Sequence, residues 1–312
     1  MMRKFFVAAF FTALAFFATH SNASFEVMIG ASDPYYLGIG AGEPNGSISS
    51  PGGFADATGR VFVAKSSLVG STVLIITTWQ SNIESANSGS FSTVNATTLN
   101  FNLYDRGLYK CANPVLGAAQ NNIGLGSNSA NCQIPDALVT AGTYANAIVA
   151  PNAIGGTLCS DWAPGGQLNQ RIVSFMNGLK SAGLTANTGF TGDTFLFLHG
   201  GETDNVSGTP RPTLATCIRN WVQAYVDNGL TNFRTFVASQ SMVNNAVNAS
   251  VTGAQADAVA SGCSSCRAGF NSDSLTGGTY RQADGTHGTA AYAAAIAAGD
   301  VAKVQACVGL TC

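Results

Sequence analysis

The stretch TVLIITTWQSN, residues 72–82, decides the fold. It begins with an almost unbroken run of apolar and β-branched residues, which is typical of a strand buried on both faces of a parallel sheet. The run ends in Trp79-Gln80-Ser81-Asn82, a polar turn that contains a serine. In open parallel sheets, active sites lie beyond the carboxyl ends of the strands. The residues that follow each strand are therefore the first candidates for chemistry.

On both sides of this run, apolar stretches alternate with helical spacing. Apolar residues recur on one face of 167–182 and of 214–226, and the alanine-rich run 287–304 predicts a closing helix. The alternation predicts an α/β fold, a three-layer α/β/α sandwich around a central, mainly parallel five-stranded sheet. The strands that we expect are 61–64, 72–78, 144–150, 194–198 and 233–238.

The N-terminus predicts a cleavable signal peptide over residues 1–23. Two basic residues precede an apolar run at 5–18, and Ser21-Asn22-Ala23 fits a small-x-small cleavage site. An uncleaved anchor is the alternative, although this apolar run is short for a bilayer. We therefore expect a secreted or periplasmic protein with no membrane span in the mature chain.

The remaining residues, 24–312, suffice for a single domain with a full core. Within it, the Gly-, Ser- and Pro-rich segment 24–60 predicts an irregular N-terminal arm, and the Asn-, Ser- and Gly-rich segment 83–142 predicts a long insertion. Only 10% of residues are charged and the net charge is −2, so composition offers no case for nucleic acid or an anionic membrane. It suits neutral polar ligands such as glycans, and it contains no signal for an oligomeric state.

All eight cysteines lie beyond the predicted signal peptide. An even number in an exported chain indicates disulfides, although the sequence alone does not choose among the many pairings. We favour pairing between neighbours: Cys111–Cys132, Cys159–Cys217, Cys263–Cys266 and Cys307–Cys312. Zinc is the rival interpretation of Cys263-x-x-Cys266, but a second ligand pair at suitable spacing is missing and an oxidising compartment favours disulfides.

The tetrapeptide Asp284-Gly285-Thr286-His287 supplies a candidate base. A carboxylate three residues before an imidazole is close enough to accept the ring's Nδ1–H and fix its tautomer. A histidine oriented in this way is the base half of a nucleophilic hydrolase. Ser81 is the matching nucleophile, because it follows the strongest strand; on its own, a plain Ser-Asn turn is the alternative.

Two other strand ends lead into glycine-bearing turns. At 152–157 the adjacent Gly155 and Gly156 let a backbone N–H approach a substrate oxygen, with a simple turn as the alternative. At 199–204 the sequence HGGETD is unusual for a mere turn. No aspartate stands at matching spacing before His199, so we interpret it as a structural histidine, with base catalysis as the alternative. Nucleotide-binding and zinc-protease motifs do not occur, so we expect no cofactor and no metal.

In this order, the blocks resemble the SGNH hydrolase superfamily, and most closely its carbohydrate-esterase branch, the sialate O-acetylesterase-like proteins. The family's G-Q-S-N is similar to residues 79–82, its glycine-bearing turn to 154–157, its Q-G-E-S-D to 200–204 and its D-x-x-H to 284–287. The likeness extends over about 70–304. It implies a flavodoxin-like sheet, chemistry without a metal, and removal of acetyl groups from a carbohydrate or another small ester.

The resemblance also implies a role for each residue. Ser81 would be the nucleophile, His287 the general base and Asp284 the group that orients it. Glu202 would be a buried carboxylate that organises the nearby loop, or alternatively a salt-bridge residue. Oxyanion donors and substrate contacts would come from the following set: Trp79, Gln80, Asn82, Gly155, Gly156, Gly200, Gly201 and Glu202.

Two positions depart from the family pattern. Trp79 replaces the glycine before Gln80, and would reshape the pocket wall or offer a stacking face to a sugar; a place in the core is the alternative. Gly200 replaces a glutamine that the family uses as an oxyanion donor, and losing one such donor lowers rates by roughly 10²–10³. Either another group substitutes, such as the Gly201 amide, or the enzyme is slow.

Three functions therefore stay open. The leading prediction is a secreted serine esterase that removes O-acetyl groups from a carbohydrate. A lipase or thioesterase of the same superfamily is the second. The third is a glycan-binding protein on a hydrolase scaffold, in which chemistry is lost with the change at Gly200. Fold alone does not choose among them.

Overall fold

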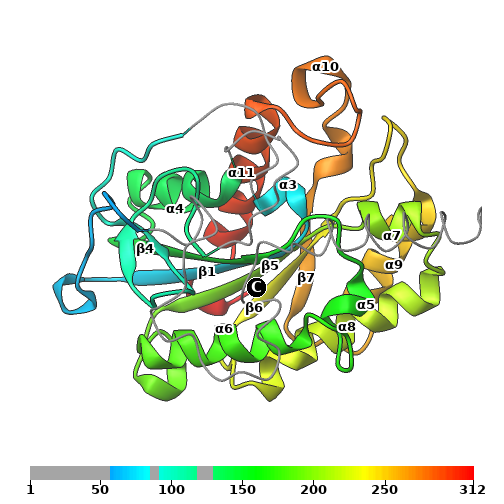
Figure 1. The fold of residues 1–312 in the computed structure, drawn as a ribbon. Helices are drawn as coiled ribbons and strands as arrows, with labels where there is room; N and C mark the ends of the chain where they lie inside the picture. The colour runs from blue at the N-terminus through cyan, green and yellow to red at the C-terminus, as the bar shows by residue number, and fades with distance from the viewer. Residues whose placement is uncertain (1–56, 85–90, 118–128) are drawn as a thin grey trace, which may run out of the picture.

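The computed structural model describes residues 57–84, 91–117 and 129–312 (Figure 1). Its middle layer is a seven-stranded sheet in the order β3-β2-β4-β1-β5-β6-β7. Every neighbouring pair is parallel except β2 and β3. The strands are β1 Thr72–Trp79, β2 Thr98–Phe101, β3 Leu108–Lys110, β4 Asn146–Ala153, β5 Asp193–His199, β6 Arg234–Ser239 and β7 Cys266–Asn271.

Helices cover both faces of the sheet, as Figure 1 shows. One face packs against α5 (Cys159–Trp162), α6 (Asn169–Ser181), α8 (Arg211–Asp227) and α9 (Ala249–Ala260). The other face packs against α4 (Ala130–Thr140) and α11 (Ala290–Gln305). The shorter helices are η1 Lys65–Ser67, α3 Ser81–Glu84, η2 Ala186–Thr188, α7 Glu202–Val206, η3 Ser272–Ser274, α10 Gly277–Tyr280 and η4 Val308–Leu310.

The central strand β1 shows why its sequence is almost entirely apolar or β-branched. Leu74 and Ile76 belong to the core under α6 and α8, whereas Val73 and Ile75 belong to the core under α4 and α11. Successive side chains of a strand point to opposite faces, and here both faces are covered, so every position after Thr72 is buried. The predicted α/β sandwich with a mainly parallel sheet is therefore confirmed.

The predicted strand count of five is wrong. Strands expected at 72–78, 144–150, 194–198 and 233–238 correspond to β1, β4, β5 and β6. The segment 61–64 contributes only an isolated bridge between Phe62 and Tyr109. The strands that sequence reasoning missed are β2, β3 and β7. β3 and β7 are the two edges of the sheet, whereas the fully buried β2 lies between β3 and β4. β2 and β3 have only four and three residues, too few for a periodic apolar pattern.

Residues 83–142 contribute more than the insertion that we expected. β2 pairs in parallel with β4, β3 pairs with β2, and α4 covers them, so the described part of this segment completes one edge of the sheet. The signal peptide predicted at 1–23 and the arm predicted at 24–60, except its last four residues, lie outside the described residues. None of the helices in the described ranges is long and apolar enough to cross a membrane.

The remaining expectations concern helices and disulfides. The segments 167–182 and 214–226 form α6 and α8, as predicted. The last helix begins at Ala290 because the Thr289 side chain caps it, accepting from the Tyr292 amide. The four cysteine pairs are the predicted neighbours: Cys111–Cys132, Cys159–Cys217, Cys263–Cys266 and Cys307–Cys312.

Candidate functional site

The candidate site lies at the carboxyl ends of the three central strands. The register places Trp79, the last residue of β1, beside Ala153 of β4 and beside His199 of β5. The turns at 152–157 and 199–204 therefore flank Ser81, which follows β1 and begins α3. The sheet topology thus brings the predicted blocks together, although they lie far apart in the sequence.

Ser81 meets the loop before α11. The Ser81 Oγ lies 3.0 Å from the His287 Nε2, and the His287 Nδ1 lies 2.6 Å from the Asp284 Oδ2. The other carboxylate oxygen of Asp284 accepts from the amides of Thr286 and His287, each at 2.9 Å. These local bonds fix the carboxylate below the ring. A hydroxyl, an imidazole and a carboxylate in one line are the groups that activate a serine for nucleophilic attack.

The Asp284 carboxylate is suited to stay ionised. Although partial burial raises its pKa, hydrogen bonds from the His287 side chain and from the backbone amides of Thr286 and His287 lower it overall. The His287 side chain is 18% exposed and that of Asp284 is 43% exposed. The base is therefore within reach of solvent and of a small ligand, while its tautomer is held by a charged acceptor.

Asn82 holds the loop of His287 on both sides. Its Oδ1 accepts from the Gly288 amide at 3.0 Å, and its Nδ2 donates to the Thr286 carbonyl at 3.2 Å. The buried guanidinium of Arg281 donates to the same carbonyl at 2.7 Å through Nη1. Because Asn82 directly follows Ser81, the nucleophile and the base are tied to one another through an adjacent side chain.

Gln80 connects the two flanking turns. Its Oε1 accepts from the amides of Gly201 and Glu202 at 3.0 and 3.1 Å, and its Nε2 donates to the Thr157 carbonyl. The amide of Gly201 is thus already engaged, which corrects its predicted role as a substitute oxyanion donor. Gln80 is 1% exposed, and its side chain holds the two turns together inside the protein.

The Gly155–Gly156 turn lies beside the end of β1, since the Ile154 amide donates to the Trp79 carbonyl at 3.0 Å. Gly156 has a φ of +73° and is exposed, whereas Gly155 is buried. A positive φ favours glycine, so the turn is not open to most other residues. Both amides remain predicted oxyanion donors.

Trp79 and Gly200, the two departures from the family pattern, contact one another. Trp79 has a φ of +105°, so its side chain does not follow the alternating directions of the strand. Its ring packs against Trp221 in the core, with ring centroids 5.1 Å apart. A Cβ at Gly200 would lie 2.4 Å from the Trp79 Cγ. Trp79 is fully buried, so the structure favours the alternative interpretation, a place in the core, over a stacking face for a sugar.

Beneath the site lies a buried polar network. The Glu202 Oε1 accepts from the Asn82 Nδ2 at 2.7 Å and from the Gln240 Nε2 at 2.6 Å. Gln240 in turn faces the His199 Nδ1 at 3.3 Å, and the His199 Nε2 lies 2.8 Å from the Asp300 Oδ2. His199 is fully buried, so the structure favours its interpretation as a structural histidine. Glu202 is buried and bonded to Asn82, and its role in organising the loop stays a prediction.

Sequence reasoning missed three of these residues, namely Gln240, Asp300 and Arg281. They contact the site from the residue after β6, from α11 and from the loop after α10, at separations that no local motif encodes. One signal existed: Asp300 is the only acidic residue of the alanine-rich α11. A carboxylate on a buried helix face needs a partner, and His199 at the end of an apolar strand is a suitable one.

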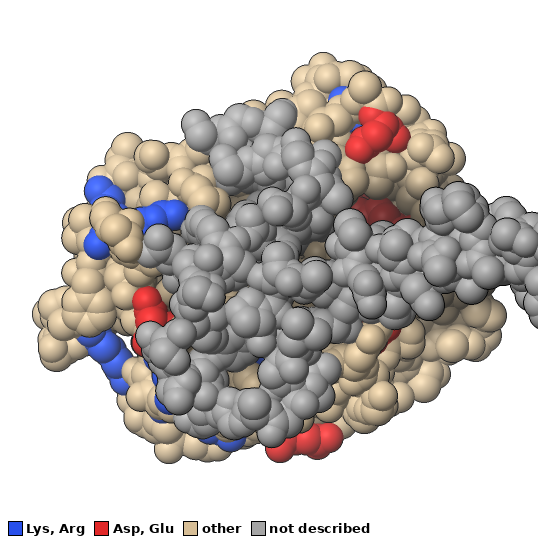
Figure 2. Space-filling view, in the orientation of Figure 1, with Lys and Arg blue, Asp and Glu red and all other residues tan. Residues whose placement is uncertain are grey.

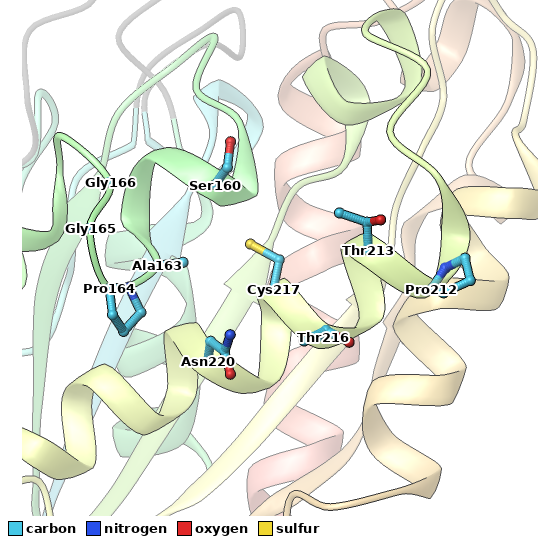
Figure 3. A pocket seen from close by; sticks show the side chains of 10 residues that line it. All are labelled: Ser160, Ala163, Pro164, Gly165, Gly166, Pro212, Thr213, Thr216, Cys217 and Asn220. Carbon is cyan, nitrogen blue, oxygen red and sulfur yellow. The ribbon is translucent and has the colours of Figure 1, made fainter.

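A cleft of about 690 Å³ lies apart from these residues, between the loop at 163–166 and the first half of α8 (Figure 3). Its wall includes neutral groups, among them the side chains of Ser160, Pro164, Thr213 and Asn220. None of the predicted site residues lines it. In the described part of the chain, no three His, Cys, Asp or Glu side chains are grouped so as to hold a metal ion.

Comparison with known proteins shows a shared fold alone. No protein-family model and no curated protein sequence matches the chain. Among solved structures, it is similar to a protein from Arabidopsis thaliana, with a TM-score of 0.57 and 12% identity over 76% of this chain and 99% of that one. It is also similar to a novel carbohydrate acetylesterase from Xanthomonas citri, with a TM-score of 0.48 and 13% identity over 74% of this chain and 55% of that one. At such identities the likeness shows a shared fold alone, and the second TM-score carries no argument about activity.

Proposed function

We propose that this chain is an exported serine esterase that removes O-acetyl groups from a carbohydrate. One observation supports the proposal most: Ser81, His287 and Asp284 form a continuous line of hydrogen bonds at the carboxyl edge of a parallel sheet. The serine and the imidazole come from segments 206 residues apart. Chance contact between a nucleophile and an oriented base is much less common than a plain serine turn, so the geometry favours chemistry at this place.

The proposed reaction is acyl transfer to water. His287 accepts the proton of Ser81 through Nε2 as the Ser81 Oγ attacks the ester carbonyl, and Asp284 stabilises the imidazolium that forms. The imidazolium then protonates the departing sugar oxygen, leaving an acetyl group on Ser81. Water, deprotonated by His287, attacks this acyl-enzyme and releases acetate, and the proton returns to Ser81.

The tetrahedral intermediate needs donors for its oxyanion. We propose that the Ser81 amide and an amide of the Gly155–Gly156 turn supply them, because this turn meets the end of β1 next to Ser81. Gly200 has no side chain to add a further donor. The packing of Trp79 against Gly200 explains why none could be added without moving the indole ring.

The proposed substrate follows from the lack of charge. On the part of the surface in Figure 2 that is not grey, Lys, Arg, Asp and Glu are scattered among uncharged residues. With 10% charged residues in the whole chain, the protein carries no strong field to attract an ionic substrate. A neutral, hydroxyl-rich ester such as an acetylated sugar fits this surface. Four disulfides fit an oxidising compartment, where such glycans are met.

The experiment uses a fluorescent phosphonate and p-nitrophenyl acetate on the wild type and on Ser81→Ala. We expect covalent labelling and turnover in the wild type and neither in the variant. Ser261→Ala is the matched control, because Ser261 is an exposed serine at the C-terminal end of α9, whereas the start of α9 lies near the carboxyl ends of the strands. It should keep both signals.

The same assay separates the alternatives. A rate that rises with acyl-chain length would favour a lipase or thioesterase over an acetylesterase. A folded wild type that takes up no phosphonate would contradict the esterase proposal and favour a glycan-binding protein. Release of acetate from acetylated polysaccharides would then identify the sugar if the small ester is turned over.

A further inference from the structure

The chain holds a second histidine–aspartate pair, which the proposed mechanism does not use. His199 and Asp300 come from β5 and α11, and both side chains are fully buried. We propose that His199 is a positioning residue: its Nδ1–H fixes the direction of a chain of hydrogen bonds that ends at Asn82 and places His287 against Ser81. The role in catalysis rests on the proposed function, whereas the direction of the bonds can be tested without it.

The direction of the chain starts from Glu202. The carboxylate oxygen Oε1 of Glu202 accepts hydrogen bonds, so the amide groups that face it are NH₂ groups. The Glu202 Oε1 lies 2.7 Å from the Asn82 side chain and 2.6 Å from the Gln240 side chain. Both amides are therefore oriented, and each presents its oxygen on the side away from Glu202.

The orientation of Gln240 decides the proton on His199. Its Oε1 is turned toward the His199 Nδ1 at 3.3 Å, and an amide oxygen only accepts. Nδ1 must then carry a hydrogen. In a free neutral imidazole either nitrogen can hold the single proton, so the environment selects the form seen here.

The opposite nitrogen faces a carboxylate. The His199 Nε2 lies 2.8 Å from the Asp300 Oδ2, so one proton is shared between them. Burial alone would lower the pKa of His199, but the Asp300 charge and hydrogen bond, with the smaller contributions of Gln240 and Glu202, raise it overall. Asp300 therefore allows Nδ1 to keep its hydrogen while Nε2 is also bonded. Phe197 lies alongside the imidazole, with ring centroids 6.1 Å apart, and adds no competing polar group.

The chain ends at the base. The Asn82 NH₂ faces Glu202, and the Asn82 oxygen accepts from the Gly288 amide at 3.0 Å. The same NH₂ group donates to the Thr286 carbonyl at 3.2 Å. These two bonds bracket His287, the residue between them. If His199 lost its Nδ1–H, Gln240 would turn its oxygen toward Glu202. The hydrogen bond from Asn82 to Glu202, which orients Asn82, would then lose the support of the Gln240 hydrogen bond to the same oxygen.

The first test measures the protons directly. The chain has three histidines, so ¹⁵N-histidine labelling of a His20→Gln/His287→Gln variant leaves only His199 visible. The His287→Gln substitution changes none of the groups that are hydrogen-bonded to the His199 ring. We expect a protonated Nδ1 at pH 8, seen as a ring N–H that exchanges slowly with water because the side chain is fully buried. An unprotonated Nδ1 in the folded variant would overturn the proposal.

The second test asks whether the chain positions the base. Gln240→Met removes both amide contacts with little change in volume. The matched control is Asn146→Leu, because Asn146 is a buried amide at the other end of β4, where it donates to the Val69 carbonyl and to Thr72. We expect kcat for p-nitrophenyl acetate to fall roughly 10–100-fold in Gln240→Met with KM little changed, and no fall in kcat in the control.

The two proposals fail in different ways. In ¹⁵N-histidine spectra of the single variants, the His287 signal should shift in Gln240→Met and stay in place in Asn146→Leu, whether or not the protein turns over an ester. Equal His287 spectra and equal kcat values in both folded variants would contradict a positioning role. A wild type that is inert to phosphonate and ester, but shows the His199 Nδ1–H and the His287 shift, would contradict the esterase and leave the hydrogen-bond chain in place.

Discussion

The two histidine–aspartate pairs share their chemical groups and differ in almost everything else. His287 and Asp284 are three residues apart, partly exposed, and in contact with Ser81. His199 and Asp300 are 101 residues apart, fully buried, and in contact with an amide network. The difference teaches that an imidazole–carboxylate pair does not define a function by itself. What faces the other ring nitrogen, and whether a ligand can reach it, assigns the role.

The first prediction breaks the exposed pair. In His287→Gln we expect kcat to fall by about 10⁴-fold or more, because Ser81 loses the group that takes its proton. The midpoint of thermal unfolding should change little, since the His287 side chain is partly exposed and held by short local bonds. Rates of p-nitrophenyl acetate hydrolysis and calorimetry measure the two effects. A variant that keeps more than a tenth of the wild-type kcat would contradict the role of His287 as the base.

The second prediction breaks the buried pair. Asp300→Ala leaves a buried imidazole without its carboxylate, and removing one partner of such a pair costs about 3 kcal/mol of unfolding free energy. The matched variant is Asp284→Ala, which we expect to cost under about 1 kcal/mol, because Asp284 is 43% exposed. Denaturant midpoints of the two variants give the comparison. Equal losses of stability would contradict the distinction drawn from burial.

The same contrast explains what the sequence could predict. The pair within 284–287 and the turn after β1 are local patterns, and the long apolar runs of β1, β4, β5 and β6 have a clear period. The bonds of Asp300, Gln240 and Arg281 depend on how α11, β6 and the loop before α11 meet, which spacing alone does not encode. β7 was missed because Arg267 and Gly269 interrupt it at the sheet edge, and β2 because only four residues form it.

Trp79 illustrates a further limit of sequence reasoning. The family comparison drew attention to Trp79 and Gly200 separately, as two departures with two consequences. Only the structure shows that the indole ring occupies the place where a side chain at Gly200 would stand. The positive φ of Trp79, which turns the ring into this space, leaves no pattern in the sequence.

The third prediction perturbs the buried side next to His199. In Gly200→Ala, the new Cβ would lie 2.4 Å from the Trp79 Cγ, so the rigid indole must move within a filled core. Overpacking of this kind costs about 2 kcal/mol of unfolding free energy. The loss of unfolding free energy caused by Gly200→Ala should be smaller in a protein that also carries Trp79→Gly, because that substitution removes the ring. A cycle of the four proteins, measured by urea unfolding, should therefore show strong coupling, and additive losses would mean that the clash is relieved elsewhere.

The last prediction sharpens the comparison with a carboxylate that has no imidazole beside it. Asp204 is 1% exposed and accepts from the Cys159 amide and from Thr209, but burial still raises its pKa to about 6. The pKa of Asp204 in the folded protein lies above its ordinary value of 3.8. Its neutral form therefore contributes to the free energy of unfolding at low pH, and this contribution is lost as the pH rises through about 6. Asp204→Asn removes the cost of burying a charged carboxylate but gives up hydrogen bonds to a charged oxygen. We therefore expect the free energy of unfolding to rise by about 1 kcal/mol at pH 7.5 and by less at pH 4.5. Thermal midpoints of variant and wild type at the two pH values test this sign. A difference that grows toward acid would mean that Asp204 is stabilised as an anion, like Asp284, and that burial alone does not separate the two regions.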